Sequence, residues 1–143
     1  MRWFNTEKDL IAFQKGTGKD QSGRTVRNIL AADDNFWEET HNYIQWLFPL
    51  KTRSGFNLLA PVVRHPERFE TPYMVDVYQR FRLFLDNSTW KEFHNHNQLR
   101  ITRGLRSLRL FGYQELADEF LKWLDSECDS EDLRKVYNTY WAQ

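Results

Sequence analysis

Residues 113–124 read YQELADEFLKWL, and this stretch carries the clearest fold signal in the chain. Its apolar side chains recur at the i, i+3, i+4 and i+7 spacing that places them on one face of a helix. The spacing therefore predicts an amphipathic helix with one buried face. The positions on that face are Tyr113, Leu116, Ala117, Phe120, Leu121 and Leu124.

The same helical period recurs through most of the chain, and no window alternates over more than a few residues as a half-buried strand would. The sequence therefore predicts an all-α fold, with residues 1–143 forming a single domain arranged as an orthogonal bundle of about six or seven helices. The expected helices follow Thr6, lie around Val26 to Leu30, cover residues 34–48, 71–85, 97–111 and 113–124, and follow Asp129 or Ser130.

The composition describes a chain that can bury a core but has no overall charge bias. Of its 143 residues, 41% are hydrophobic and 16% are aromatic, which is ample apolar material for one core. Twenty basic residues balance twenty acidic ones. Net charge therefore gives no argument for nucleic acid or a membrane surface as a partner.

The compartment expected from the sequence is the cytoplasm. The first nine residues carry charges where a signal peptide needs an apolar stretch, and no apolar run is long enough to be a transmembrane segment. Cys128 is the single cysteine, so no internal disulfide can form. These features predict a soluble protein of a reducing compartment.

The helix expected over residues 34–48 carries the first candidate site. His41 and Gln45 lie next to each other at the edge of its apolar face, one turn apart, and Trp46 points away from that face. They could form a polar notch beside an aromatic ring, suited to a peptide or small ligand. The alternative is a structural role, with the histidine hydrogen-bonded within the fold and Trp46 covered by the following loop.

The helix expected over residues 97–111 carries a second candidate. Arg100, Arg103, Arg106 and Arg109 recur every three residues and sweep the half of the helix opposite its apolar stripe. Such a basic face could bind a phosphate-bearing or acidic partner, nucleic acid included. The alternative is internal pairing with the acid-rich segment 114–132.

Motifs for catalysis and for cofactors are missing from the sequence. The stretch Gly16 to Lys19 fails the phosphate-loop pattern, because Phe13 occupies the position of its first glycine. His94 and His96 would point about 200° apart on a helix, and one cysteine with four histidines makes a poor metal set. The sequence therefore predicts a protein that is not an enzyme and that needs no metal or cofactor, although an enzyme of unrecognised type stays an alternative.

Two stretches resemble a known family. Residues 41–49, HNYIQWLFP, resemble the H-x-Y-I-Q-W-L-F-P signature of the opioid growth factor receptor conserved domain. Residues 99–103, LRITR, resemble its second block, and Ala60-Pro61 fits the linker between the two. The resemblance is strongest over residues 20–124.

The resemblance implies a helical domain with receptor-like binding of an opioid growth factor peptide, and an association with the nucleus or the nuclear envelope. The polar and aromatic cluster within the signature makes His41, Gln45 and Trp46 the candidate ligand contacts, with Arg100 and Arg103 as anchors for an anionic group. We therefore expect a binding module whose partner is a peptide or protein.

Overall fold

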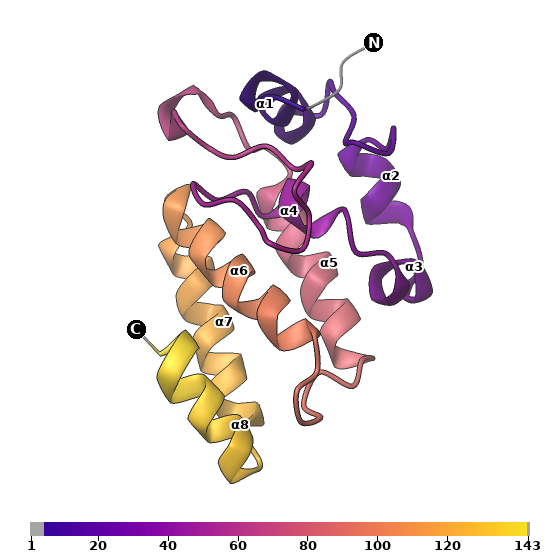
Figure 1. The fold of residues 1–143 in the computed structure, drawn as a ribbon. Coiled ribbons are helices and arrows are strands. Elements are labelled where there is room, and N and C mark those ends of the chain that lie inside the picture. Colours follow the sequence, from indigo (N-terminus) through magenta and orange to yellow (C-terminus); the bar gives the residue numbers. More distant parts are fainter. Residues whose placement is uncertain (1–4, 143) are drawn as a thin grey trace. The chain divides into compact units, whose positions relative to one another are not determined.

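The computed structural model describes residues 5–142, and helices are the regular structure of these residues, with no strand among them (Figure 1). The all-α prediction is therefore confirmed. The described residues form eight α-helices, one 3-10 turn and one π turn. They are α1 (Glu7–Lys15), α2 (Val26–Ala31), α3 (Asp34–Glu39), α4 (Ile44–Leu47), η1 (Pro66–Arg68), α5 (Met74–Asp86), α6 (Asn97–Leu110), α7 (Gln114–Glu127), α8 (Glu131–Val136) and the π turn η2 (Tyr137–Trp141).

The chain divides into two compact units, residues 1–87 and residues 88–143. Unit 1 holds α1 to α5, and unit 2 holds α6 to α8 with η2. Beside this division into two units, the single domain and the orthogonal arrangement stay predictions.

Local sequence sets both ends of α1. Thr6 caps it as expected, since its hydroxyl accepts from the Asp9 amide while the Asp9 carboxylate accepts from the Thr6 amide. Gly16 ends the helix with φ of 95°, a left-handed conformation that glycine adopts without strain. A Cβ at Gly16 would also lie 2.6 Å from the Tyr73 ring, so a side chain has no room there.

The prediction of one continuous helix over residues 34–48 is wrong, because the helix is interrupted at residues 40–43. α3 ends at Glu39, and Thr40 has an extended backbone with φ of −92° and ψ of 133°. Thr, His and Asn at positions 40–42 are weaker helix formers than Ala or Leu. The Tyr43 hydroxyl also donates to the Trp37 carbonyl, which a continuous helix would offer to the amide four residues on. The chain therefore restarts as the short helix α4.

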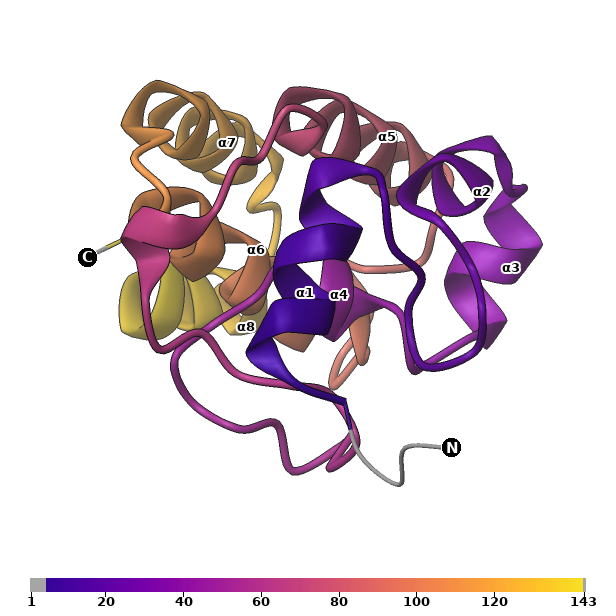
Figure 2. The same ribbon diagram turned by 90° about the horizontal axis from the view of Figure 1, so that it is seen from above.

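Aromatic side chains build the core of unit 1. Trp37 is fully buried and packs against the rings of Tyr43, Phe81 and Phe84. α1 packs on α4 and α2 packs on α5 (Figure 2). The helix expected over residues 71–85 is α5, and the six apolar side chains of its inner face are buried: Met74, Val77, Tyr78, Phe81, Phe84 and Leu85.

Unit 2 follows its predicted helices. The helix expected over residues 97–111 is α6, and the buried side chain of its first residue, Asn97, accepts a hydrogen bond from Arg100. The helix expected after Asp129 or Ser130 is α8, which Ser130 caps and which becomes the π turn η2 after Val136. Trp141 is fully buried there, and its indole N–H donates to the Thr102 hydroxyl at 2.9 Å.

Candidate functional site

Trp46 is fully buried, so the structural alternative holds for this residue rather than the predicted ligand contact. The break at residues 40–43 changes the direction of the chain, and the indole is fully buried with its ring edge-on to Phe13 of α1. Gln45 is buried as well, whereas His41 is exposed. The predicted notch of three neighbouring side chains is therefore wrong for Gln45 and Trp46, and His41 alone of the three faces solvent.

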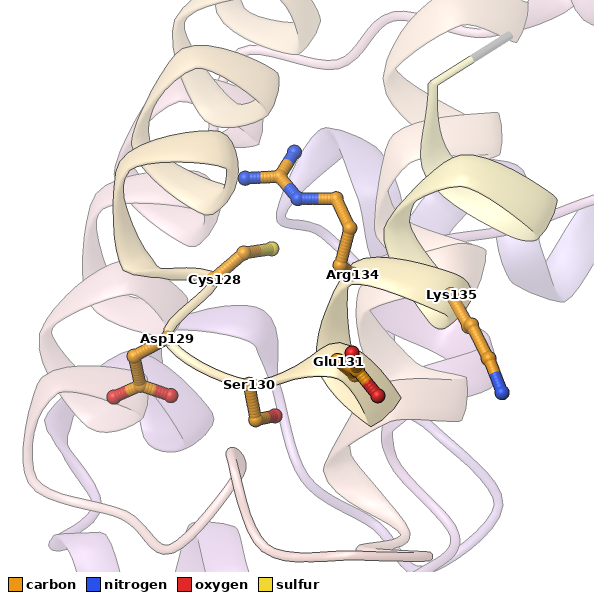
Figure 3. A pocket seen from close by; sticks show the side chains of 6 residues that line it. All are labelled: Cys128, Asp129, Ser130, Glu131, Arg134 and Lys135. Carbon is orange, nitrogen blue, oxygen red and sulfur yellow. The ribbon is translucent and has the colours of Figure 1, made fainter.

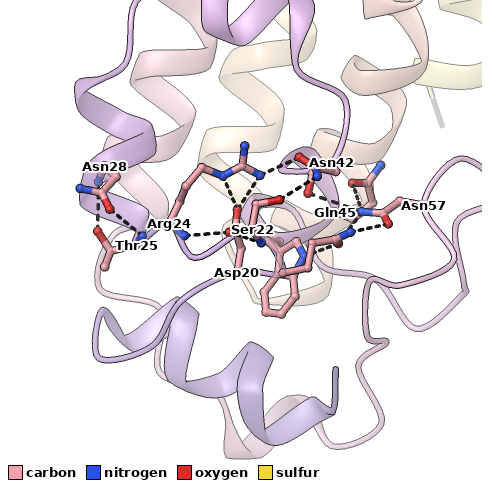
Figure 4. A network of polar contacts seen from close by, with 10 residues as sticks. Asp20, Ser22, Arg24, Thr25, Asn28, Asn42, Gln45 and Asn57 are labelled. Atoms are coloured by element: carbon pink, nitrogen blue, oxygen red, sulfur yellow. Dashed lines mark hydrogen bonds and ion pairs between the residues drawn. The ribbon is translucent and has the colours of Figure 1, made fainter. Parts of the chain in front are cut away.

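A buried polar network surrounds the side chains of Gln45 and Trp46 (Figure 4). The amides of Gln21 and Asn57 exchange two hydrogen bonds, at 3.1 Å and 2.8 Å. The Asn57 amide also donates to Gln45 Oε1 at 3.0 Å, and the Trp46 indole donates to Gln21 Oε1 at 3.0 Å. The network thus joins the loop after α1, helix α4 and the segment around Asn57.

A second branch of this network closes around Asp20, whose carboxylate is fully buried. It accepts from the backbone amides of Ser22 and Arg24, and the Arg24 guanidinium pairs with it at 2.8 Å. Arg24 also donates to the Asn42 side chain at 2.7 Å, and Asn42 donates to the Ser22 hydroxyl (Figure 4). Because its charge is paired and hydrogen-bonded, Asp20 orders the loop rather than offering a free carboxylate.

Residues 51–60, which we call the apolar loop, present large apolar side chains to solvent. Phe56 is 81% exposed, Leu58 is 67% exposed and Leu59 is 55% exposed, whereas Asn57 between them is only 7% exposed. The loop therefore turns its polar side chain inward and its apolar side chains outward.

Three more hydrogen bonds hold the apolar loop in shape. The Arg53 guanidinium donates to the carbonyls of Leu58 at 2.8 Å and of Ala60 at 3.2 Å. The Asn5 amide donates to the Leu59 carbonyl at 3.1 Å. Together with Asn57, these bonds fix a segment that has no regular secondary structure.

The chain beyond the apolar loop is tied to the start of α1 by Glu7. Its carboxylate accepts from the backbone amides of Arg64 and His65, and it lies 2.9 Å from Nδ1 of His65. Burial alone would raise the pKa of Glu7, but these hydrogen bonds and the His65 side chain outweigh it and hold the pKa below its ordinary value. The carboxylate is therefore engaged in structure.

The predicted basic face of α6 is uneven. Arg106 is exposed, Arg103 and Arg109 are half-buried, and Arg100 is buried beside Asn97. Burial lowers the pKa of Arg103 to about 10, and Arg109 donates to the Trp141 carbonyl at 3.4 Å. Arg100 and Arg103 belong to unit 2, whereas His41 and Gln45 belong to unit 1.

Two acids of α7 form ion pairs outside the arginine row. Asp125 pairs with Arg134 at 2.6 Å, and Glu127 pairs with Lys91 at 3.2 Å. These pairs connect α7 to α8 and to the segment before α6. The alternative in which the arginines of α6 pair with the acids of segment 114–132 stays a prediction.

A shallow hollow lies where α7 leads into α8 (Figure 3). The Cys128 thiol points toward the Arg134 side chain there, and Lys135 points away from both. Burial and the nearby Asp125 and Asp129 raise the pKa of the thiol more than Arg134 lowers it. The thiolate needed for nucleophilic chemistry is therefore disfavoured near neutral pH.

Within residues 5–142, no cluster of three or more His, Cys, Asp or Glu side chains is arranged to hold a metal ion. None of the helices in this range has the length and apolar character needed to cross a membrane.

These observations define an all-α protein in which a buried polar network joins α4 to an exposed apolar loop. Among known proteins, the chain is similar to opioid growth factor receptor-like protein 1 of mouse (Mus musculus) and of rat (Rattus norvegicus). Each is 30% identical over 124 aligned residues, which cover 69% of this chain and 26% of the relative. The chain thus spans about a quarter of the length of these curated relatives. No protein-family model and no solved structure matches it.

Proposed function

We propose that this chain is a non-enzymatic, receptor-like binding module of the opioid growth factor receptor family, and that its apolar loop holds a peptide or protein segment. The family is supported by the distant similarity to the two rodent receptor-like proteins and by the signature over residues 41–49. The receptor-like name of those relatives favours a peptide as the ligand.

The exposure of the apolar loop is the observation that carries the proposal. Phe56, Leu58 and Leu59 stand in solvent, and burying each of them against a partner would contribute roughly 1.5–3 kcal/mol. The hydrogen bonds of Asn57 and Arg53 hold the loop before any partner arrives. Such preorganisation lowers the entropy cost of binding.

This proposal changes the roles of the residues that the sequence singled out. Gln45 and Trp46 act as positioning residues, since both are buried and reach the loop through Asn57 and Gln21. His41 stays a candidate contact because it is exposed next to Asn42 of the same network.

Arg100 and Arg103 are not part of the proposed contact surface. Arg100 is buried and Arg103 is half-buried, which weakens the nucleic-acid alternative, because that alternative requires a row of accessible cations. The cytoplasmic location expected from the sequence belongs to the proposal, and imaging of a fluorescent fusion tests it, with a nuclear signal as the contrary result.

The test is selection of a random peptide library, displayed on phage, against the purified chain. We expect enrichment of peptides that bind the unmodified chain and lose at least tenfold in affinity with the double variant Phe56→Ser/Leu58→Ser. The matched control is Leu83→Ser, because Leu83 of α5 is 56% exposed and lies outside the apolar loop.

Circular dichroism of each variant establishes that it is folded before affinities are compared. Failure to enrich any peptide would overturn the proposal, as would peptides that bind the double variant as tightly as the unmodified chain. Equal losses with Leu83→Ser would move the binding surface away from the apolar loop.

A further inference from the structure

The segment that contains the apolar loop carries basic side chains but no acidic ones. From Thr40 to Pro66 the sequence has no Asp or Glu, whereas Lys51, Arg53 and Arg64 are all exposed there. Two of these cations, Lys51 and Arg53, lie within the apolar loop itself. The exposed apolar side chains are therefore flanked by positive charge with no acid of their own segment to neutralise it.

The acid that α1 brings to this segment is already engaged. Glu7 accepts from the amides of Arg64 and His65 and lies against the His65 ring. Asn5, which contacts the loop at the Leu59 carbonyl, is uncharged. The contacts that hold the loop thus leave the charges of Lys51 and Arg53 without a carboxylate supplied by these neighbours.

The two loop cations differ in what they do. Arg53 uses its Nη1 to bind the Leu58 and Ala60 carbonyls, so its charge stays next to the apolar side chains while it shapes the loop. A guanidinium keeps further N–H donors after such a bond, and these suit a carboxylate. Lys51 is exposed and supplies a mobile positive charge.

The charge pattern favours a peptide over a lipid surface. Basic segments that recognise anionic bilayers typically gather about four to eight Lys and Arg, and the apolar loop has two. Unit 1 as a whole carries twelve Lys and Arg against eleven Asp and Glu. A nearly neutral unit gains little from the field of a membrane, whereas two local cations are enough to select a peptide by charge.

We infer that the segment bound by the apolar loop is an acidic, apolar peptide, in which carboxylates lie beside the side chains that cover Phe56, Leu58 and Leu59. This inference rests on the proposed function and adds the chemical class of the partner. The apolar contacts supply most of the affinity, and Lys51 with Arg53 supplies the preference for negative charge.

The experiment uses the peptides selected above and copies in which each Asp and Glu is changed to Asn or Gln. We expect the selected peptides to be acidic, and their neutral copies to bind about fivefold more weakly for each carboxylate that contacts the loop. Raising the salt concentration should weaken binding of the acidic peptide and leave binding of its neutral copy nearly unchanged.

Charge reversal on the protein gives the second arm. Lys51→Glu should lower the affinity for the acidic peptide at least fivefold and leave the affinity for the neutral copy unchanged. The control is Lys15→Glu, the same change at the far end of α1 from Asn5, which should alter neither affinity. We choose Lys51 because a change at Arg53 would also remove the bonds that shape the loop.

Each result separates the two proposals. Suppose that neutral copies bind as tightly as the acidic peptides, and that Phe56→Ser/Leu58→Ser loses affinity for both. This result would overturn the inference of an acidic partner and leave the proposed function standing. Failure to enrich any peptide would overturn both. Binding to vesicles of phosphatidylserine and phosphatidylcholine that is lost in the same double variant, without peptide binding, would assign the loop to membranes instead.

Discussion

The Trp46 indole N–H donates to the side-chain oxygen of Gln21 at 3.0 Å, although 25 residues separate the two in sequence. The same oxygen accepts from Asn57 at 2.8 Å. One amide oxygen therefore connects helix α4, the loop after α1 and the apolar loop. The tryptophan of the signature has a structural place in the fold, and the surface that it supports lies in the neighbouring loop.

Trp46 should contribute strongly to stability. Trp46→Ala removes a fully buried ring and should lower the free energy of unfolding by about 3–5 kcal/mol, and Trp46→Phe should cost less because it keeps most of the ring. Chemical denaturation followed by far-ultraviolet circular dichroism measures both changes. The control Lys19→Ala, at an exposed site, should stay within about 0.5 kcal/mol. Equal effects at Trp46 and Lys19 would contradict the buried position.

The contacts of the Glu7 carboxylate with Arg64 and His65 should make the stability of the fold depend on pH. The pKa of Glu7 in the folded chain lies below its ordinary value of 4.5. These contacts therefore stabilise the fold above that pH, and their contribution is lost as the pH falls through the folded-state pKa. The difference in unfolding free energy between the unmodified chain and Glu7→Gln should therefore be largest near neutral pH and shrink in acid. The exposed Glu67→Gln serves as the control. A difference that stays constant across this range would show that the charge of Glu7 is not involved.

Thr102 should matter through its hydroxyl. Thr102→Val keeps the shape of the side chain but leaves the indole N–H of the fully buried Trp141 without its partner. We expect a loss of about 1–3 kcal/mol in the free energy of unfolding. The same substitution at exposed Thr52 should cost much less. If both variants unfold at the same denaturant concentration as the unmodified chain, the bond to Trp141 contributes nothing.

Cys128 should react slowly with alkylating reagents. Its thiol pKa is raised chiefly by burial, and the thiolate is the reactive form. The rate of modification by iodoacetamide near neutral pH should therefore be well below that of the same chain in denaturant. Mass spectrometry follows the reaction at this single cysteine. A folded chain that reacts as fast as the unfolded one would contradict a protected thiol.

The amino-acid sequence by itself determined the helices and most of their buried faces. The spacing in residues 113–124 and the stripe from Met74 to Leu85 are local properties, because a helix repeats every 3.6 residues and its apolar positions can be read in order. The caps at Thr6 and Ser130 and the stop at Gly112 are equally local, since each depends on residues within a few positions.

The tertiary structure alone decided where the candidate site lies. A helix continued through residues 40–43 would place Trp46 away from the apolar face, but Tyr43 bonds back to the Trp37 carbonyl and the helix is broken there. The inward turn of Asn57 depends on Gln21, 36 residues away, and no periodic pattern encodes such a contact. The exposure of Phe56 follows from that turn. Long-range hydrogen bonds therefore decide which of these side chains are buried and which are exposed, and such bonds leave no signature in the local spacing of residues.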